Sequence, residues 1–361
     1  MPDSSRSVLL GPLLKSVSRS FYLTLRVLPA GMHDPVGLAY LLARAADTIA
    51  DTSLIAPQRR LELVLSLRAQ VNNQSDGERP DPEALALIGT EVGRRQKDSN
   101  EKTLLESLGS ALALLSELST SDRDAVREIV TTITTGMEFD LRTFPDESSG
   151  RISALQQFSE LDRYTYLVAG CVGEFWTKMT IAHAPGSFKA PLDAIVQRGI
   201  RFGKALQMTN VLRDCSKDLR IGRCYLPAPM LAQAGLSPED LSSPENSLCA
   251  RPVLFELIRT TLDHYREAVE YTLSLSAFSI RLRLACVWPV VIGLETLVLL
   301  VDNDRWLDPA NPSKIRRNDV YRIMARSTLL VASNGQLRRW MEGLIAEVEE
   351  RMEAIEHGSR Q

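Results

Sequence analysis

Two pairs of aspartates in this sequence have the spacing needed to bind divalent metal ions. Asp47 and Asp51 form the first pair, and Asp214 and Asp218 form the second, each in the pattern Asp-x-x-x-Asp. Residues four apart on a helix share one face, so each pair presents two carboxylates in one direction. Their repulsion would be relieved by Mg²⁺, which takes carboxylate oxygens together with waters and phosphates. A single such pair more often belongs to a solvated helix face, so the surrounding residues must distinguish a metal site from such a face.

The residues around both pairs favour a binding site for a diphosphate. Apolar residues dominate the stretch 38–46, so Asp47 is expected to open onto a largely buried helix. Arg44 precedes Asp47 by three residues, and Arg213 and Arg223 lie near the second pair. Guanidinium groups bind phosphate oxygens bidentately. A helix face that carries both metal-binding acids and arginines suits the ionisation of an allylic diphosphate, because it stabilises the negative charge of the departing diphosphate. The second face continues upstream through Gln207 and Asn210.

Composition narrows the classes of function further. The chain has 361 residues, of which 44% are hydrophobic and 24% charged, as in ordinary globular proteins. Its formal charge of −3 leaves no basic excess, so no nucleic-acid partner is expected. Five cysteines without a C-x-x-C pair indicate reduced thiols and a cytoplasmic location. The four histidines lack any recurring ligand spacing, which argues against a zinc site.

Helices must position these residues, because apolar side chains recur mostly at helical spacing and period-two alternation is scarce. Breaks rich in Pro, Gly, Asp and Asn separate the helical stretches, but none has the length or composition of a flexible linker. The sequence therefore predicts an all-α fold in a single helical domain over residues 1–361, with its core at about 10–340.

The most apolar stretch, Leu284–Val301, approaches the length that spans a membrane. It contains Pro289 and Glu295, and a carboxylate at the bilayer centre costs about 2.5–3.5 kcal/mol on insertion scales. We therefore expect a buried core helix and no transmembrane anchor. No secretion signal is predicted, because the N-terminal residues lack a continuous apolar segment. The charged segment Arg338–Glu356 is expected to be helical, and peripheral membrane contact is left open.

Four motifs together resemble the squalene/phytoene synthase family in their order and spacing. They are SRSF at Ser18–Phe21, Y-x-x-x-R-x-x-D-x-x-x-D at Tyr40–Asp51, YTYLVAGCVGE at Tyr164–Glu174 and TNVLRDCSKDLRIGRCYLP at Thr209–Pro227. The last third, VWPVVIGLETLVLLVDN followed by KIRR at Lys314–Arg317, is similar to the squalene-synthase branch of that family. The resemblance covers most of the chain.

The resemblance implies an isoprenoid-synthase helical bundle with a central cavity for prenyl diphosphates. It implies Mg²⁺-dependent head-to-head condensation of two farnesyl diphosphates to presqualene diphosphate, followed by reduction with NADPH to squalene. The family's metal-binding and catalytic acids match Asp47, Asp51, Asp214 and Asp218, and the tyrosine proposed to assist proton removal matches Tyr164. Substrate would be bound by Arg19, Tyr40, Arg44, Gln207, Asn210, Arg213 and Arg223, and NADPH by Lys314 and Arg316.

Departures from the family pattern keep alternatives open. Ala50 and Lys217 stand where many members have an acid, and Arg283 with Ala285 stand where squalene synthases usually have aromatic residues. The second departure favours a non-reductive relative that makes presqualene diphosphate, dehydrosqualene or phytoene. A catalytically inactive scaffold is disfavoured, because it has no need to keep repelling carboxylates together. A class I terpene cyclase is disfavoured by its different motifs. Prenyl chain length, NADPH against NADH, and oligomeric state stay open.

Two features also have a purely structural interpretation. Without the resemblance, a phenol such as that of Tyr164 on an apolar helix is more often a hydrogen-bonded core residue. Gly170 and Gly173 would leave room for prenyl chains, or equally for the close packing of another helix.

Overall fold

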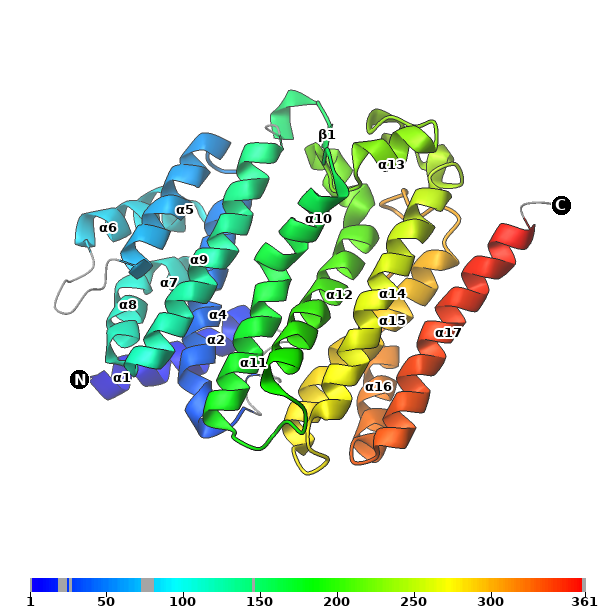
Figure 1. The fold of residues 1–361 in the computed structure, drawn as a ribbon. Coiled ribbons are helices and arrows are strands. Elements are labelled where there is room, and N and C mark those ends of the chain that lie inside the picture. The colour runs from blue at the N-terminus through cyan, green and yellow to red at the C-terminus, as the bar shows by residue number, and fades with distance from the viewer. Residues whose placement is uncertain (1, 19–24, 26–27, 73–80, 145–146, 359–361) are drawn as a thin grey trace. The chain divides into compact units, whose positions relative to one another are not determined.

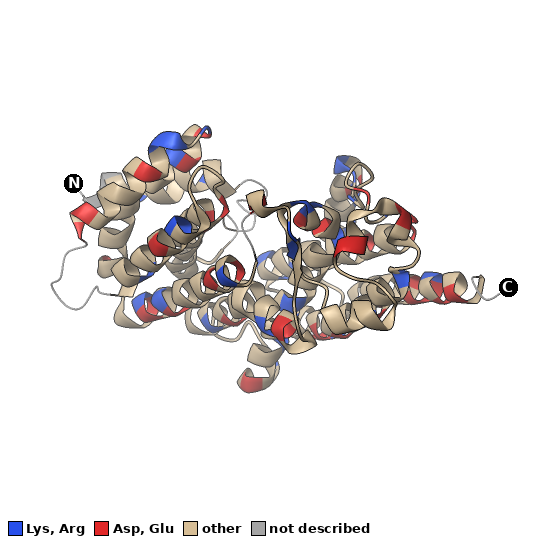
Figure 2. Cartoon of the chain, turned by 90° about the horizontal axis from the view of Figure 1, so that it is seen from above, with Lys and Arg blue, Asp and Glu red and all other residues tan. Residues whose placement is uncertain are grey.

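The computed structural model describes residues 2–18, 25, 28–72, 81–144 and 147–358, and it confirms the all-α fold class (Figure 1). Within these residues, the regular structure is helical apart from two short strands. Charged residues of both signs are spread along the helices (Figure 2). Arg19 and Phe21 lie outside the described residues.

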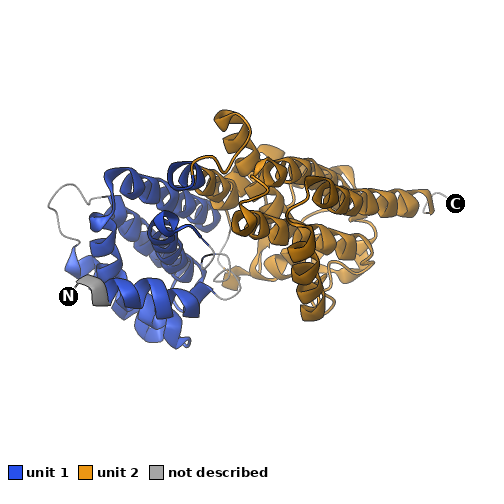
Figure 3. Ribbon diagram, turned by 90° about the horizontal axis from the view of Figure 1, so that it is seen from below, with its two compact units in different colours: residues 1–142, 178–184 blue, residues 143–177, 185–361 orange. Residues whose placement is uncertain are grey.

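The chain forms two compact units (Figure 3). Unit 1 comprises Met1–Arg142 and Lys178–Ala184, and unit 2 comprises Thr143–Thr177 and Pro185–Gln361. The single domain predicted for residues 1–361 stays a prediction.

Unit 1 is built around α4 (Ala30–Asp51), the helix that carries the first aspartate pair. Leu38, Leu41 and Leu42 of this helix have no exposed surface, because α4 packs on α5 and α8. The other elements that begin in unit 1 are α1 (Pro2–Val8), the π-helix η1 (Leu9–Leu13), α2 (Leu14–Ser18), α5 (Pro57–Asn72), α6 (Pro82–Glu91), η3 (Gly93–Arg95), α7 (Ser99–Glu106), α8 (Leu108–Glu117) and α9 (Thr120–Thr143).

Aspartate side chains cap two of these helices and so fix where they begin. Asp81 Oδ1 accepts a hydrogen bond from the backbone N of Glu83 at 2.9 Å, at the start of α6. Asp98 Oδ1 accepts one from the backbone N of Asn100 at 2.8 Å, at the start of α7. Such caps satisfy amide groups that have no partner inside the helix. The cap of α7 places Glu101 in the first turn of that helix.

Unit 2 is built around α12 (Leu192–Asp218), which carries the second aspartate pair and packs along α14 (Arg251–Ser274). Its strands β1 (Ser153–Ala154) and β2 (Arg223–Cys224) pair in parallel. The other elements are η4 (Glu147–Ser149), α10 (Phe158–Thr165), the π-helix η5 (Tyr166–Gly170), α11 (Cys171–His183, whose end belongs to unit 1), η6 (Leu219–Ile221), α13 (Ala228–Gln233), η7 (Glu239–Ser242), η8 (Pro244–Ser247), α15 (Ile280–Val301), α16 (Arg317–Leu330) and α17 (Asn334–Gly358).

Glycines allow α11 and α12 to approach each other closely within unit 2. A Cβ atom added at Gly173 would lie 1.9 Å from the carbonyl oxygen of Gly199. No side chain fits in that space, so the position requires glycine. At Gly170 an added Cβ would meet only side-chain atoms, the nearest at 3.1 Å. Of the two interpretations of this segment, the structure supports close packing of another helix at Gly173.

The most apolar stretch of the sequence forms α15. This helix is long and apolar enough to cross a membrane, and 61% of its most apolar 18-residue window is buried inside the structure. It packs against α14, α16 and α17. Trp288 Nε1 of α15 donates a hydrogen bond to Ser327 Oγ of α16 at 2.8 Å. This burial supports the predicted core helix, and α17 confirms that the charged segment Arg338–Glu356 is helical.

Candidate active site

The first aspartate pair lies at the C-terminal end of α4, in unit 1. Helical spacing puts Asp47 and Asp51 one turn apart on the same face, as predicted. Asp51 is exposed, and Asp47 keeps 40% of its side-chain surface open to solvent. Tyr40 and Arg44 lie on the preceding two turns of the same helix. The hydroxyl of Tyr40 donates to the carbonyl oxygen of Val17, on α2, at 3.4 Å.

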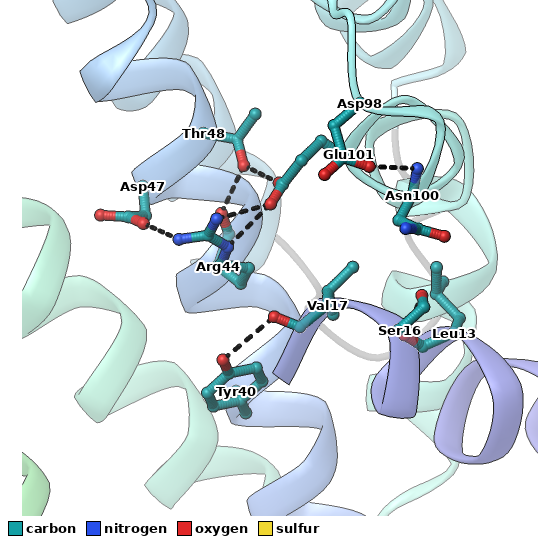
Figure 4. A network of polar contacts seen from close by, with 10 residues as sticks. All are labelled: Leu13, Ser16, Val17, Tyr40, Arg44, Asp47, Thr48, Asp98, Asn100 and Glu101. Atoms are coloured by element: carbon teal, nitrogen blue, oxygen red, sulfur yellow. Dashed lines mark hydrogen bonds and ion pairs between the residues drawn. The ribbon is translucent and has the colours of Figure 1, made fainter. Parts of the chain in front are cut away.

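Arg44 is held between two acids, as Figure 4 shows. Its Nε and Nη2 both donate to Glu101 Oε1, at 3.1 and 2.5 Å, and its Nη1 donates to Asp47 Oδ2. Glu101 belongs to α7 and is buried, and its other oxygen accepts a hydrogen bond from the hydroxyl of Thr48. The guanidinium is therefore fixed by the buried carboxylate of Glu101 on one side and contacts Asp47 on the other.

The carboxyl group of Asp47 is easier to protonate than an ordinary aspartate. Burial and repulsion by Asp51 raise its pKa to about 6, against the opposing charge of Arg44. Because the side chain remains partly exposed, a cation can reach it. A divalent cation would remove the repulsion between the two carboxylates, and oxygen donors are those that Mg²⁺ prefers. The residues of this pair therefore fit a magnesium ion.

The second aspartate pair lies at the C-terminal end of α12, in unit 2. Arg213 donates to Asp214 through Nε at 3.2 Å and through Nη2. Lys217 Nζ donates to Asp214 Oδ1 at 3.3 Å. Burial acts to raise the pKa of Asp214, but the bonds and charges of Arg213 and Lys217 outweigh it and lower that pKa. Asp214 is thus kept ionised beside two cations, and Lys217 contacts a carboxylate that was predicted to bind metal.

The rest of the second face follows the predicted steps along α12. Asn210 Nδ2 donates to Gln207 Oε1 at 3.4 Å, and Asp218 is half-buried on the last turn. Arg223 follows on β2, with its Nη2 3.9 Å from Glu147 Oε1. These donors and acceptors are oxygen and nitrogen groups suited to a hydrated cation and its phosphate ligands.

Tyr164 lies on α10 and is buried against a second tyrosine. Its hydroxyl donates to the hydroxyl of Tyr225 at 3.2 Å, and the two rings stack with centroids 4.7 Å apart. Phe144 packs edge-on against Tyr225, at 5.0 Å between centroids. The structure therefore bears out a hydrogen-bonded, buried phenol, and places a second phenol next to it.

The residues expected to bind NADPH lie on the segment between α15 and α16. Lys314 is exposed on that segment, and Arg316 is exposed at the position that caps α16. Arg283 of α15, which stands where squalene synthases usually have an aromatic residue, has a structural role. It is fully buried, and it donates to the carbonyl oxygen of Leu275 at 3.0 Å and to Asn334 Oδ1 at 2.6 Å.

The first aspartate pair and its neighbours Tyr40 and Arg44 lie on α4, whereas the second pair lies at the end of α12, with Arg223 on β2. Sequence reasoning missed two residues: Glu101, which contacts Arg44, and Tyr225, which contacts Tyr164. Glu101 is 57 residues from Arg44 and gives no local signal. Tyr225 stands inside the quoted motif around the second pair, so its proximity to that motif could have drawn attention to it.

Comparison with known proteins agrees with this arrangement. The sequence profile of the squalene/phytoene synthase family matches residues 14–319. The squalene synthase of Eremothecium gossypii is 25% identical over 321 residues, which cover 87% of this chain and 66% of that protein. The bifunctional lycopene cyclase/phytoene synthase of Colletotrichum graminicola is 28% identical over 263 residues, covering 71% of this chain and 40% of that protein. The chain thus spans about two thirds of the length of the first relative and well under half of the length of the second.

Solved structures agree at the level of the fold. The complex of TcSQS with the ligand BPH1237 matches with a TM-score of 0.74 and 21% sequence identity, covering 98% of this chain and 99% of that one. The family profile covers well over half of the sequence, and both aspartate pairs lie within it. The chain therefore belongs to the squalene/phytoene synthase family.

Proposed function

We propose that this protein is a prenyltransferase that joins two prenyl diphosphates head to head, and that its substrate is farnesyl diphosphate. The observation that carries the proposal is shared by both helices: a pair of carboxylates one turn apart, with an arginine bonded to its first member. Acids and guanidinium groups in this arrangement match a diphosphate bridged by metal ions. Membership of the family supports the same chemistry.

Asp47 and Asp51 would hold Mg²⁺ in unit 1, and Asp214 and Asp218 would hold it in unit 2. When bound, Mg²⁺ supplies positive charge that stabilises the departing diphosphate. Arg44 would keep Glu101 through Nε and Nη2, and the N–H groups of its Nη1 would become available to a phosphate oxygen once Asp47 binds the metal. Arg213, Arg223, Tyr40, Gln207 and Asn210 are the further groups proposed to contact substrate, with Arg19 from outside the described residues.

Tyr164 is proposed to assist when the cyclopropane ring of presqualene diphosphate closes. In that step a C–H bond breaks, its electron pair forms the ring, and a proton leaves. The oxygen of Tyr164 would accept that proton as its own proton passes to the hydroxyl of Tyr225, and the proton of Tyr225 would pass on to the released diphosphate, which is the final base. Burial of both rings keeps bulk water from the cation, which would otherwise be trapped as an alcohol.

We further propose that NADPH reduces the second cation, so that squalene is the product. The segment with Lys314 and Arg316 supports this, since both side chains are exposed and cationic, as phosphate groups of the cofactor require. Arg283 has a structural reason to be present on α15, because its guanidinium donates hydrogen bonds to two segments outside that helix. Ala285, in contrast, remains a departure from the aromatic residues of squalene synthases.

A non-reductive product is the second candidate. The bifunctional lycopene cyclase/phytoene synthase is 28% identical over 71% of this chain, beside 25% over 87% for the squalene synthase, so both kinds of enzyme are among the relatives. Such a relative would stop at presqualene diphosphate or release dehydrosqualene or phytoene.

One experiment separates these candidates. The purified protein is incubated with farnesyl diphosphate and Mg²⁺, with and without NADPH, and lipid and diphosphate fractions are analysed by mass spectrometry. Squalene formed only with NADPH supports the reductive reaction. Presqualene diphosphate or dehydrosqualene in both incubations refutes reduction but keeps the condensation. Absence of products from both farnesyl and geranylgeranyl diphosphate contradicts the prenyltransferase proposal itself.

A further inference from the structure

One end of unit 2 exposes several large apolar side chains. We name residues 185–192, 275–281 and 326–339 the three-loop end, because each segment contains a turn between two helices. It lies at the lower edge of the view in Figure 1, where α14 ends and α15 and α17 begin. Phe278 is 93% exposed, Leu329 82%, Leu192 53% and Ile280 37%. Single exposed apolar residues are common on protein surfaces, whereas several of them on turns at one end of a unit indicate an interaction surface.

Hydrogen bonds join the three segments into one surface. The backbone N of Lys189 donates to the carbonyl oxygen of Ser274 at 3.0 Å, and that of Ser276 donates to Ser187 at 2.7 Å. Arg283 then joins the second segment to the third, because it donates to both Leu275 and Asn334. The exposed apolar side chains are therefore carried by turns that are fixed to one another.

The charge of the three-loop end has a single sign. Its sequence contains no aspartate or glutamate, and the nearest acid on α12 is Asp193. Its five basic residues are Lys189, Arg281, Arg326, Arg338 and Arg339. Arg338 is paired with Glu270 and Glu342, and Arg326 lies over the ring of Trp340 at 4.5 Å. Lys189, Arg281 and Arg339 are exposed, and none of them forms an ion pair with another residue that the structure describes.

We propose that the three-loop end docks onto the surface of an anionic lipid bilayer. Apolar tips that enter the headgroup region, on segments that carry exposed cations and contain no acid, are a combination that binds such surfaces. Phe278 and Leu329 insert into the headgroup region of the bilayer, while the neighbouring basic side chains contact lipid phosphates. The proposal rests only on unit 2 and needs no step of the prenyl transfer, although it would place an enzyme of apolar products at a membrane.

The test uses the full-length protein and sedimentation with vesicles of phosphatidylcholine, either pure or with a quarter phosphatidylglycerol. The wild-type protein should bind the anionic vesicles more tightly than the neutral ones, and less tightly as salt rises. Phe278→Ser combined with Leu329→Ser should weaken binding by about tenfold or more, since each side chain loses its transfer from water. Lys189→Gln combined with Arg281→Gln should remove most of the preference for anionic lipid.

Leu248→Ser is the matched control, because Leu248 is 57% exposed and lies just before α14. That helix has 24 residues, so Leu248 is about 36 Å from the three-loop end. A second readout locates the contact: brominated lipid should quench the added emission of Phe278→Trp but not that of Leu248→Trp. Circular dichroism establishes that each variant folds.

Three results would overturn the proposal. The wild-type protein could fail to bind either vesicle, or Leu248→Ser could weaken binding as much as the paired serine variant. The third is dimerisation in light scattering that the paired serine variant abolishes while vesicle binding persists, because the apolar surface would then contact a second copy of the chain. Prenyl transfer with soluble substrate in the variants reports separately on the proposed function.

Discussion

Arg44 contacts two acids whose tasks differ. Asp47 is partly exposed on the same helix, whereas Glu101 comes from α7 and is buried. A charge-assisted bond to a buried carboxylate fixes a guanidinium that would otherwise sample many rotamers. Arg44, which we propose to contact the diphosphate, and Glu101, which positions Arg44, are therefore distinct residues, and Glu101 is the buried one.

Glu101→Gln is predicted to raise the KM for the prenyl diphosphate by about tenfold or more, with a smaller loss in kcat. The amide can still accept from Arg44 but loses the charge, and hydrogen bonds to charged groups contribute about 1.5–3 kcal/mol. Steady-state kinetics and urea unfolding measure the two effects separately.

Glu106→Gln is the matched control for this prediction. Glu106 ends the same helix, with 52% of its side chain exposed, and its only ion pair among the described residues is with Lys102 at 3.9 Å. The Glu106→Gln variant should keep the KM and the kcat of the wild type. Equal KM values for Glu101→Gln and the wild type would show that Glu101 does not position Arg44.

Helices, rather than loops, carry most of the site, and their packing depends on a few small residues. α11 and α12 approach within van der Waals contact of each other's backbone only because Gly173 and Gly199 lack side chains. Since α12 also carries the second aspartate pair, its position against α11 bears on the geometry of the site.

Gly173→Ala is predicted to destabilise the protein by about 1–3 kcal/mol or more, because the added methyl would overlap the carbonyl oxygen of Gly199. Gly343→Ala on α17 supplies the control, since no atom lies within 4 Å of an added Cβ there. That variant should be neutral or more stable by up to about 1 kcal/mol, as alanine favours helix. Equal unfolding midpoints for the two variants in urea would refute the close approach.

The burial of His264 on α14 predicts that the stability of the protein depends on pH. Burial lowers the pKa of His264 to about 4, with Arg201 and Lys204 of α12 acting in the same direction and Asp162 of α10 and neighbouring Asp263 opposing them. In the unfolded chain the pKa is about 6.5, so between those values the unfolded state binds the proton. Stability should therefore be full above pH 6.5 and fall as pH drops toward 4, by about 3 kcal/mol.

Urea unfolding at a series of pH values measures this effect. His264→Leu, which takes up no proton, should show a smaller loss of stability over the same range. His357→Leu changes an exposed histidine at the end of α17 and should behave as the wild type does. If His264→Leu loses as much stability on acidification as the wild type, the pH dependence has another source.

At the scale of the whole molecule, the two carboxylate pairs lie in different compact units. A metal-dependent enzyme needs both pairs, whereas a scaffold that only keeps the fold needs neither. Asp47→Asn combined with Asp214→Asn is therefore predicted to lower turnover by at least about a hundredfold, because several kcal/mol of transition-state stabilisation are lost. The unfolding midpoint should change little, as both side chains keep their shape.

Asp124→Asn combined with Asp304→Asn makes the same change in charge, with one exposed aspartate in each unit. This control should retain full turnover. Product formation from farnesyl diphosphate at saturating Mg²⁺ is the measurement. A doubly substituted Asp47/Asp214 protein that keeps more than a tenth of wild-type turnover would argue against metal binding by these pairs.

The sequence alone predicted the all-α class, the helices that carry both aspartate pairs, and the buried apolar helix α15. These features depend on periodicity and on spacing within one helix, and such distances are set by local geometry. The proximity of Arg44 to Asp47 and of Arg213 to Asp214 was also available, because each pair of residues is separated by one turn or less.

Only the tertiary structure decided which residues support that site. Glu101 reaches Arg44 across 57 positions, Tyr225 reaches Tyr164 across 61, and Arg283 reaches Asn334 across 51. Such contacts depend on how helices pack and in which register, and a single sequence carries no local signal of either. The same holds for Gly173, whose lack of a side chain has a reason only once α12 lies against it. Site residues that lie within one helical turn of each other could therefore be predicted from the sequence. The residues that position them come from distant parts of the sequence, so only the packing of the helices identified them.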